Sequence, residues 1–376
     1  MIRTAAMRSR QTTGRWFLRI VARCFRGVNQ PGVLVLAVAL LSGLITLAAS
    51  FRSSEAGSTT LVRKYRVGES TVYRTQTRTT TTIHTNPVGL EAFLPPIPTV
   101  ITTQQQNTVK VRAIHPDATV DVENHFDRFE MDYDLPERTP KELRDSILHE
   151  QQAFCRHVNG QTLVAHYDRE GHLLRFEGAE GILESLSAPV RQPVEQVIKF
   201  FLEQLGGARF YPDHAVRLDE EWKRDFKEQP TTTFPWAVET ENTYRYSGQT
   251  DERGERAAVI EFRFTNLLTP PRISLTGGAA AEPLKDVSRE DRLHVEIRGR
   301  GKGQMLVALE GGRILENKAD IHQALTGSLK TVPGVNQPAS SPITVEMNAD
   351  TAFKMEAGQD EGRLFPRAAG AEVPQR

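Results

Sequence analysis

The chain has 376 residues, of which 39% are hydrophobic and 25% charged, and its 47 basic and 47 acidic residues balance to a formal net charge of zero. Eight arginines and no acidic residue lie within positions 1–52, and removing them leaves 39 basic against 47 acidic residues in the rest of the chain. That mildly acidic remainder argues against nucleic acid as a partner, because phosphate binding requires a concentrated positive face.

Residues 32–50 form an apolar stretch directly after the basic lead of residues 1–31. No charged residue occurs between Val33 and Ala49, and a helix over this stretch spans roughly 28 Å, close to the hydrocarbon thickness of a bilayer. The positive-inside rule keeps the lead in the cytoplasm. We therefore expect a transmembrane signal-anchor that crosses a bacterial inner membrane once. It is followed by a small, polar tether over residues 51–60 and by a periplasmic region.

The alternative for this stretch is a cleaved signal peptide and a secreted product. Small residues at 48–50 and 54–56 suit cleavage. Ser50 stands where a lipoprotein signal has its lipidated cysteine, so no lipid anchor is expected. The two cysteines, Cys24 and Cys155, fall on opposite sides of the predicted membrane segment and form no disulfide framework. We expect Cys155 to be a small, buried apolar residue.

Residues 61–356 are predicted to form a β-rich extracytoplasmic region. Runs rich in Thr, Val and Tyr at 61–66 and 70–82 flank a Val-Gly-Glu turn and predict a hairpin. A second strand pair is predicted over 99–114 and 118–133. Its inward side chains are expected to be Val109, Val111, Ile114, Val120, Val122, Phe126 and Phe129.

The segment between these strand pairs, residues 86–98, does not continue a sheet, because four prolines interrupt it. Its apolar side chains either fold back over the edge of the core or form a contact loop toward a ligand, a partner or a membrane. The candidate contact residues are Leu90, Phe93, Leu94 and Ile97.

Two amphipathic helices follow. The first is predicted to have Thr139 as N-cap and Pro140 as its first residue, and to end at Asn159 and the glycine after it. A hairpin over residues 161–177 separates it from the second helix. That helix, over residues 194–205, has apolar residues at the i, i+3, i+4 spacing of a single buried face.

The chain then returns to strands, with turns predicted at residues 251–256, 299–303 and 310–312 and a disordered tail over 357–376. Together these elements predict an α+β fold, mainly antiparallel β, in which one or more curved sheets are packed by two amphipathic helices. The β region either contains two similar halves, divided near residues 180–210, or shares one long sheet.

No catalytic motif is complete in the exported region. His149 and Glu150 begin a helical HExxH zinc motif, but Ala153 stands where the second histidine is required. The glycine-rich residues 299–303 lack the Lys-Ser/Thr pair and the helix of a phosphate-binding loop, so a hairpin turn is predicted there. No nucleophile elbow and no Cys/His metal spacing occur. We expect no cofactor, no metal and no enzymatic activity. A glycosidase-type carboxylate pair stays open, because its separation in space defines it.

Four segments are similar to those of known proteins: residues 61–82, 210–222, 257–264 and 299–321, the last with the sequence GRGKGQMLVALEGGRILENKADI. They resemble a bacterial family of exported proteins of unknown function, and the resemblance covers most of residues 61–356. It implies an antiparallel sheet similar to the curved half-barrels of lipoprotein carriers, which enclose a hydrophobic groove. It implies no catalytic residues.

The leading hypothesis is a non-enzymatic envelope protein, tethered to the membrane through residues 32–50, that binds a lipid-like hydrophobic ligand or a protein partner on a concave sheet. One alternative is a structural or assembly module of the envelope. The other is a hydrolase with an unsignalled carboxylate site, which requires a cleft with two close acids.

Overall fold

The computed structural model describes residues 58–86, 96–186, 188–208, 210–229, 237–269, 294–329 and 343–358. The predicted membrane segment at residues 32–50 lies outside these ranges, as do the basic lead and residues 359–376. Within the described ranges, no helix has both the length and the hydrophobicity needed to cross a bilayer.

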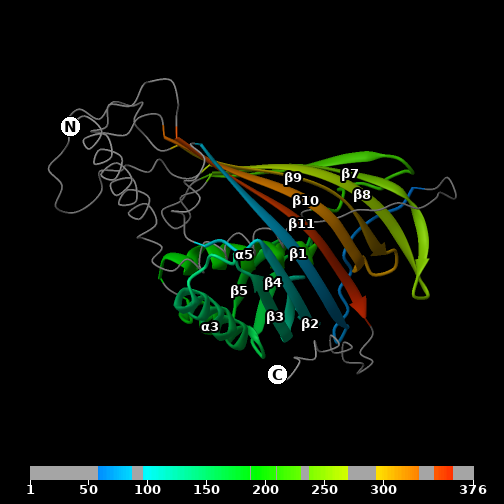
Figure 1. Cartoon of the computed structure of the whole chain (residues 1–376). Helices are drawn as coiled ribbons and strands as arrows, with labels where there is room; N and C mark the ends of the chain where they lie inside the picture. Colours follow the sequence, from blue (N-terminus) through cyan, green and yellow to red (C-terminus); the bar gives the residue numbers. More distant parts are fainter. Residues whose placement is uncertain are drawn as a thin grey trace, which may run out of the picture.

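Eleven described strands form a single curved antiparallel sheet (Figure 1). Strands that follow each other along the chain are neighbours in the sheet except β5 and β6, and the order is β5-β4-β3-β2-β1-β11-β10-β9-β8-β7-β6. The first and last strands pair with each other, so β5 and β6 are the two edges. The mainly antiparallel α+β fold is therefore confirmed. The strands are β1 (Ser70–Asn86), β2 (Val100–Ile114), β3 (Val120–Asp134), β4 (Thr162–Tyr167), β5 (Leu173–Glu177), β6 (Glu221–Glu228), β7 (Ala237–Glu252), β8 (Glu255–Thr269), β9 (His294–Ala308), β10 (Ile314–Leu329) and β11 (Ile343–Gly358).

Three described helices lie on the concave side of the sheet (Figure 1). Helix α3 (Lys141–Val158) connects β3 to β4, while α4 (Glu180–Glu184) and α5 (Ala188–Gly206) connect the two edge strands. Helix α5 corresponds to the helix predicted at residues 194–205, and it begins six residues earlier. The prediction rested on the apolar repeat, which begins at Val194, whereas Pro193 already lies in the second turn of α5.

The start of α3 differs from the prediction at its cap. Pro140 occupies the N-cap position and makes no side-chain cap hydrogen bond. The hydroxyl of Thr139 is buried without a described partner. A turn in which the Thr139 backbone N–H donates to Pro136 O places this residue before the cap. The predicted end is confirmed, because Asn159 is the C-cap and Gly160 adopts a φ of 80°, which favours glycine.

The predicted hairpin between residues 61–66 and β1 does not form. Both sides of β1 are already occupied, by β2 and β11. Residues 61–66 instead run toward the connection between β9 and β10, where the Lys64 N–H donates to Gly311 O at 2.9 Å. Just before them, Thr59 forms an isolated bridge with Val216. The segment therefore joins parts of the chain that are far apart in sequence.

The glycine-rich residues 299–303 are part of strand β9 rather than a turn, so that prediction is wrong. The sheet register places Gly301 opposite Phe264 and Gly299 opposite Asn266, on the concave face. A Cβ at Gly301 would lie 2.3 Å from the Phe264 ring, and one at Gly299 would lie 2.0 Å from Asn266 Oδ1. The glycines thus leave room for side chains of the neighbouring strand, a requirement that local sequence does not reveal.

The hydrophobic core lies between the concave face and the helices. Six of the seven side chains predicted to point inward from β2 and β3 are buried; Ile114, at the end of β2, is 43% exposed. The core also contains residues of β6 to β11. The two runs of sequential strands, β1–β5 and β6–β11, therefore contribute to one hydrophobic cluster.

Candidate functional site

A cavity of about 150 Å³ lies between the concave face and the three helices. We call it the central cavity. Its lining comes from α3, α4 and α5 on one side and from β1, β2, β3, β4, β10 and β11 on the other. The sheet thus forms the floor of the cavity and the helices form its cover.

The helical side of the central cavity is apolar apart from Gln204. Helix α5 contributes Val194, Ile198, Phe201 and Leu205, a spacing that places them on one helix face. This is the face that the sequence pattern predicted. Helix α3 adds Phe154 and Val158, and α4 adds Ile182.

Two hydroxyl groups hold the C-terminal half of α5 against the sheet and the segment that precedes β1. The Tyr167 hydroxyl on β4 donates to Leu202 O at 2.7 Å, and the Tyr65 hydroxyl donates to Gly206 O at 3.3 Å. Leu202 itself is completely buried. These contacts, together with the apolar face, fix the helix over the cavity.

The sheet side of the cavity is divided into an apolar and a polar part. The apolar part includes Phe126 and Phe129 of β3 and Leu163 of β4. The Phe129 ring meets the Phe154 ring edge to face, with centroids 5.8 Å apart, which is a favoured aromatic geometry.

The polar part, which we call the polar strip, consists of Thr75, Thr77, Thr103, Gln105 and Asn317. These residues lie on β1, β2 and β10. The threonine-rich sequence of β1 produces its share of the strip through the two-residue period of a strand. Threonines at odd positions point to the concave face, while Arg74, Gln76 and Arg78 lie on the opposite face.

Two atoms of the polar strip have no hydrogen-bond partner among the described residues. They are Thr75 Oγ1 and Asn317 Oδ1, and both are buried. Gln105, in contrast, donates to Asn107 Oδ1 at 3.0 Å. No charged side chain is among the described residues that line the cavity.

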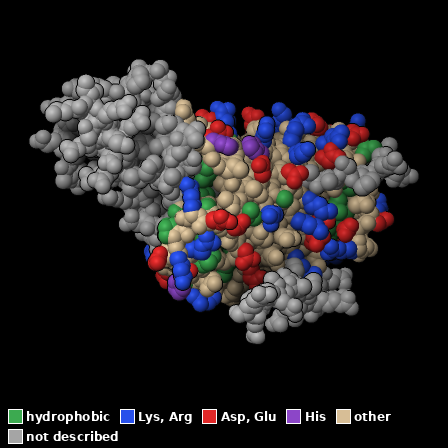
Figure 2. Space-filling model, in the orientation of Figure 1, with side chains coloured by type: hydrophobic (Ala, Val, Ile, Leu, Met, Phe, Trp, Pro, Cys, Tyr) green, Lys and Arg blue, Asp and Glu red, His purple; other side chains and the backbone are tan. Residues whose placement is uncertain are grey.

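The outer surface has the opposite character. Figure 2 shows basic and acidic side chains interspersed over the visible face of the described residues. Several form exposed ion pairs along a strand, for example Lys354 with Glu356 and Arg128 with Glu130. The outer surface of the described residues therefore carries many charged side chains, whereas the described lining of the central cavity carries none.

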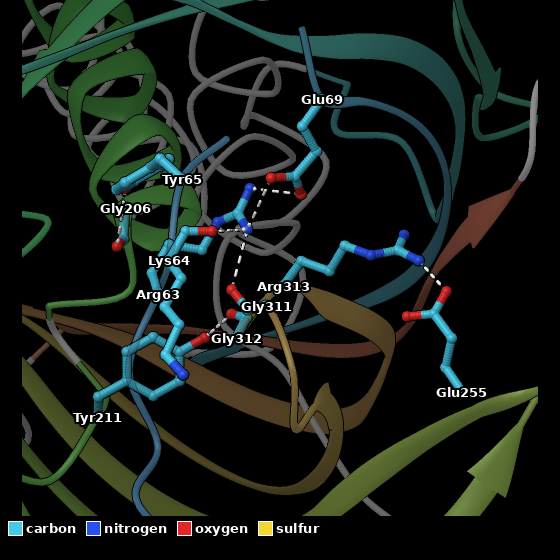
Figure 3. Close-up of polar contacts among 10 residues, drawn as sticks. All are labelled: Arg63, Lys64, Tyr65, Glu69, Gly206, Tyr211, Glu255, Gly311, Gly312 and Arg313. Atoms are coloured by element: carbon cyan, nitrogen blue, oxygen red, sulfur yellow. Dashed lines mark hydrogen bonds and ion pairs between the residues drawn. The ribbon is translucent and has the colours of Figure 1, made fainter. Parts of the chain in front are cut away.

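A largely buried ion pair lies next to the cavity, in a region that shares Leu205 and Ile314 with the cavity lining. Figure 3 shows the contacts of this pair. The Arg63 side chain is 10% exposed, and its guanidinium group contacts Glu69 Oε1 at 3.0 Å and donates to Gly311 O at 3.1 Å. It also lies 4.8 Å from the centre of the Tyr65 ring.

The aromatic residues around this pair extend the packing. The Tyr211 hydroxyl donates to Gly312 O, and Arg313 pairs with Glu255 (Figure 3). Burial raises the pKa of the Tyr65 and Tyr211 hydroxyls, so both stay protonated and neither supplies a base at neutral pH. The donors of Arg63 are directed at protein acceptors, and we assign this cluster to structure.

The predicted contact loop is described only at its end. Ile97 is half-buried and packs against the hydrophobic core, and it does not line the central cavity. Leu90, Phe93 and Leu94 lie outside the described residues. Residues of the cavity itself were missed as a site, because Thr75 and Asn317 belong to strands with no local binding motif.

Residues considered for metal or acid–base chemistry do not converge on the cavity. His149 is exposed on α3. Among the described residues, one group could present three metal ligands close together, Asp168, Glu170 and His172. It forms the turn between β4 and β5, where Asp168 Oδ1 accepts a hydrogen bond from the His172 backbone N–H at 2.8 Å, an ordinary turn contact.

Comparisons with known proteins give no family. No protein-family model and no curated protein matches the chain. Among solved structures, an outer membrane channel from Pseudomonas putida F1 is similar at 7% identity over 79% of this chain and 97% of that chain, with a TM-score of 0.13. A likeness at this TM-score carries no argument. The antiparallel sheet implied by the resemblance to exported proteins is present, and the relationship to lipoprotein carriers stays a prediction.

Proposed function

We propose that this protein is a non-enzymatic binding protein of the bacterial envelope and that it holds a lipid-like hydrophobic group in the central cavity. The observation that carries the proposal is the cavity lining, which is apolar on the helical side and contains no charged side chain among the described residues. Ligand sites in proteins are concave and mostly apolar, with a few polar groups that orient the ligand.

The physical driving force is burial of apolar surface, which contributes about 25 cal/mol per Å² removed from water. A dry cavity of about 150 Å³ in another protein accepts a molecule the size of benzene. The central cavity has a similar volume, so in this conformation it accommodates the end of an acyl chain rather than a complete one. A longer chain requires α5 to shift or the chain to leave the cavity at one end.

The location is proposed from the sequence. Residues 32–50 support a membrane tether with the sheet domain on the outer side of the inner membrane, where lipid-like groups are abundant; cleavage and secretion are the alternative. The resemblance to exported proteins and to lipoprotein carriers supports the same class of ligand.

Photolabelling tests the proposal. The purified full chain, kept soluble in amphipol so that detergent does not compete, is irradiated with a diazirine derivative of palmitic acid, and labelled peptides are identified by mass spectrometry. We expect label on peptides that contain Phe129, Phe154 or Phe201. Ile198→Trp fills the cavity and should abolish this labelling.

Leu174→Trp is the matched control, because Leu174 is 58% exposed on β5 and the same side chain is added away from the cavity. Labelling should persist in this variant. Label that is absent from the wild type, or equal in both tryptophan variants, would refute the proposed function.

A further inference from the structure

We propose that the ligand is an acyl chain with an uncharged hydrogen-bond donor, a hydroxyl or an amide N–H, and that Thr75 or Asn317 accepts the hydrogen bond of this group. The inference rests on the proposed function and specifies the chemistry of its ligand. It excludes a plain hydrocarbon chain as the preferred occupant.

The register of the sheet places Thr75 and Asn317 on the same face. Gln105 is directly opposite Thr75, Thr75 is opposite Met355, and Met355 is opposite Asn317. Residues paired in this way point to the same face, and neighbouring strands are about 4.8 Å apart. Thr75 and Asn317 therefore lie on either side of Met355, about 10 Å from each other by strand spacing, on the floor of the central cavity.

Both side chains have unused hydrogen-bonding capacity. Thr75 Oγ1 and Asn317 Oδ1 are both buried and lack a described partner, whereas buried polar atoms are satisfied in the great majority of cases. Leaving such atoms unsatisfied destabilises the protein, and a bound group that completes their hydrogen bonds gains affinity. Both residues line the cavity, so a ligand in the cavity is placed to supply that group.

The atoms of Thr75 and Asn317 limit the chemical type of the ligand group that can bind them. An amide oxygen such as Asn317 Oδ1 only accepts, while the Thr75 hydroxyl donates or accepts. An ester or ether on the ligand has no donor and leaves Asn317 unsatisfied. A hydroxyl or an amide N–H satisfies either residue.

The lining of the central cavity also limits the charge of the bound ligand group. With no charged side chain among the described lining residues, an ionised group inside the cavity would lose its hydration without an ionic partner, which is strongly unfavourable. The bound group is therefore neutral, and a charged head group of the same molecule stays outside. The polar strip lies opposite the apolar face of α5, so the ligand presents its donor toward the sheet and its hydrocarbon toward the helices.

Competition against the photoreactive palmitic acid tests this assignment on the full chain. The competitors are two matched pairs, palmitic acid with 3-hydroxypalmitic acid and stearic acid with 12-hydroxystearic acid. We expect the hydroxylated member of at least one pair to compete at about 3- to 10-fold lower concentration than its plain partner. This ratio corresponds to the affinity gained from one neutral hydrogen bond.

Thr75→Val and Asn317→Leu remove the two acceptors, and at least one of the two variants should bring the ratio within that pair toward one while binding of the plain acid is retained. Thr81→Val is the matched control, because Thr81 is on the same strand, is 5% exposed and also has an unsatisfied hydroxyl, but does not line the cavity. The wild-type ratio should persist in that variant.

The outcomes separate the two proposals. Equal competition within both pairs in the wild type, or a ratio unchanged by both Thr75→Val and Asn317→Leu, overturns the assignment of the donor and leaves the proposed function intact. Absence of cavity labelling in the wild type overturns the proposed function itself.

Discussion

Replacing Gly301 with alanine tests whether the glycine-rich part of β9 is a packed strand. The new Cβ would lie 2.3 and 2.4 Å from two atoms of the Phe264 ring and 3.0 Å from Asp320 O. Ordinary contacts begin at 3.4 Å, so the Phe264 ring must move by about 1 Å to accommodate the new Cβ. Because Phe264 is only 3% exposed, this movement displaces other core side chains, which is unfavourable. Overpacking costs about 1–3 kcal/mol, and alanine in a strand recovers roughly 0.5–1 kcal/mol relative to glycine. We expect a net loss of up to about 2.5 kcal/mol.

The matched control is Gly327→Ala in the neighbouring strand β10, where the nearest atom to the new Cβ is Val345 O at 3.8 Å. This variant should be as stable as the wild type or more stable by up to about 1 kcal/mol. Both are measured by urea denaturation of the full chain, at unchanged dependence on denaturant. Phe264→Leu in the same chain should reduce the cost of Gly301→Ala by coupling of the two sites. Equal stabilities of the two alanine variants would refute the reasoning.

Three further predictions concern other described residues. Arg63→Met removes the ion-pair partner of Glu69, whose side chain is 20% exposed. Because this exposure lets water solvate the carboxylate, the variant should lose about 1–3 kcal/mol in urea denaturation, less than a fully buried pair costs; a loss below about 1 kcal/mol would contradict a structural role for this pair. Burial alone raises the pKa of Asp121, but hydrogen bonds from two histidines outweigh it and lower the pKa below its ordinary value of 3.8. The resulting stability is present at neutral pH and lost as the pH falls through the lowered pKa, so the deficit of Asp121→Asn relative to wild type should shrink below about pH 4, and a deficit constant with pH would count against it. Burial raises the pKa of the Cys155 thiol. In a Cys24→Ser variant at pH 8, Cys155 should therefore react more slowly with a disulfide reagent in the folded protein than in protein unfolded by urea. Equal reaction rates in the two states would disprove its protection.

Helix α5 and the strands β2 and β3 were predictable because their patterns are local. The apolar face of α5 repeats at helical spacing, and the inward valines of β2 alternate with polar residues, so each segment indicates its own buried side. The end of α3 was predictable for a similar reason, since Gly160 tolerates the positive φ that stops the helix.

The glycines of β9 and the segment before β1 were predicted wrongly because their conformations depend on distant residues. Gly301 is in a strand because Phe264 needs the space, and residues 61–66 are displaced from β1 because β11, nearly three hundred residues later in the chain, takes that side. Neither partner is visible in a local pattern, since propensity near glycine favours a turn and threonine-rich neighbours favour a hairpin.

The antiparallel class, the amphipathic helices and the uneven distribution of charge are all readable from local periodicity and composition. The pairing of β1 with β11, which joins all eleven described strands into one sheet, and the cavity between this sheet and the helices both depend on contacts between residues far apart in the chain. The candidate site depends on this long-range strand pairing. Thr75 and Asn317 are separated by more than two hundred residues, and they share one cavity floor because long-range strand pairing, rather than any local motif, places β1, β11 and β10 side by side.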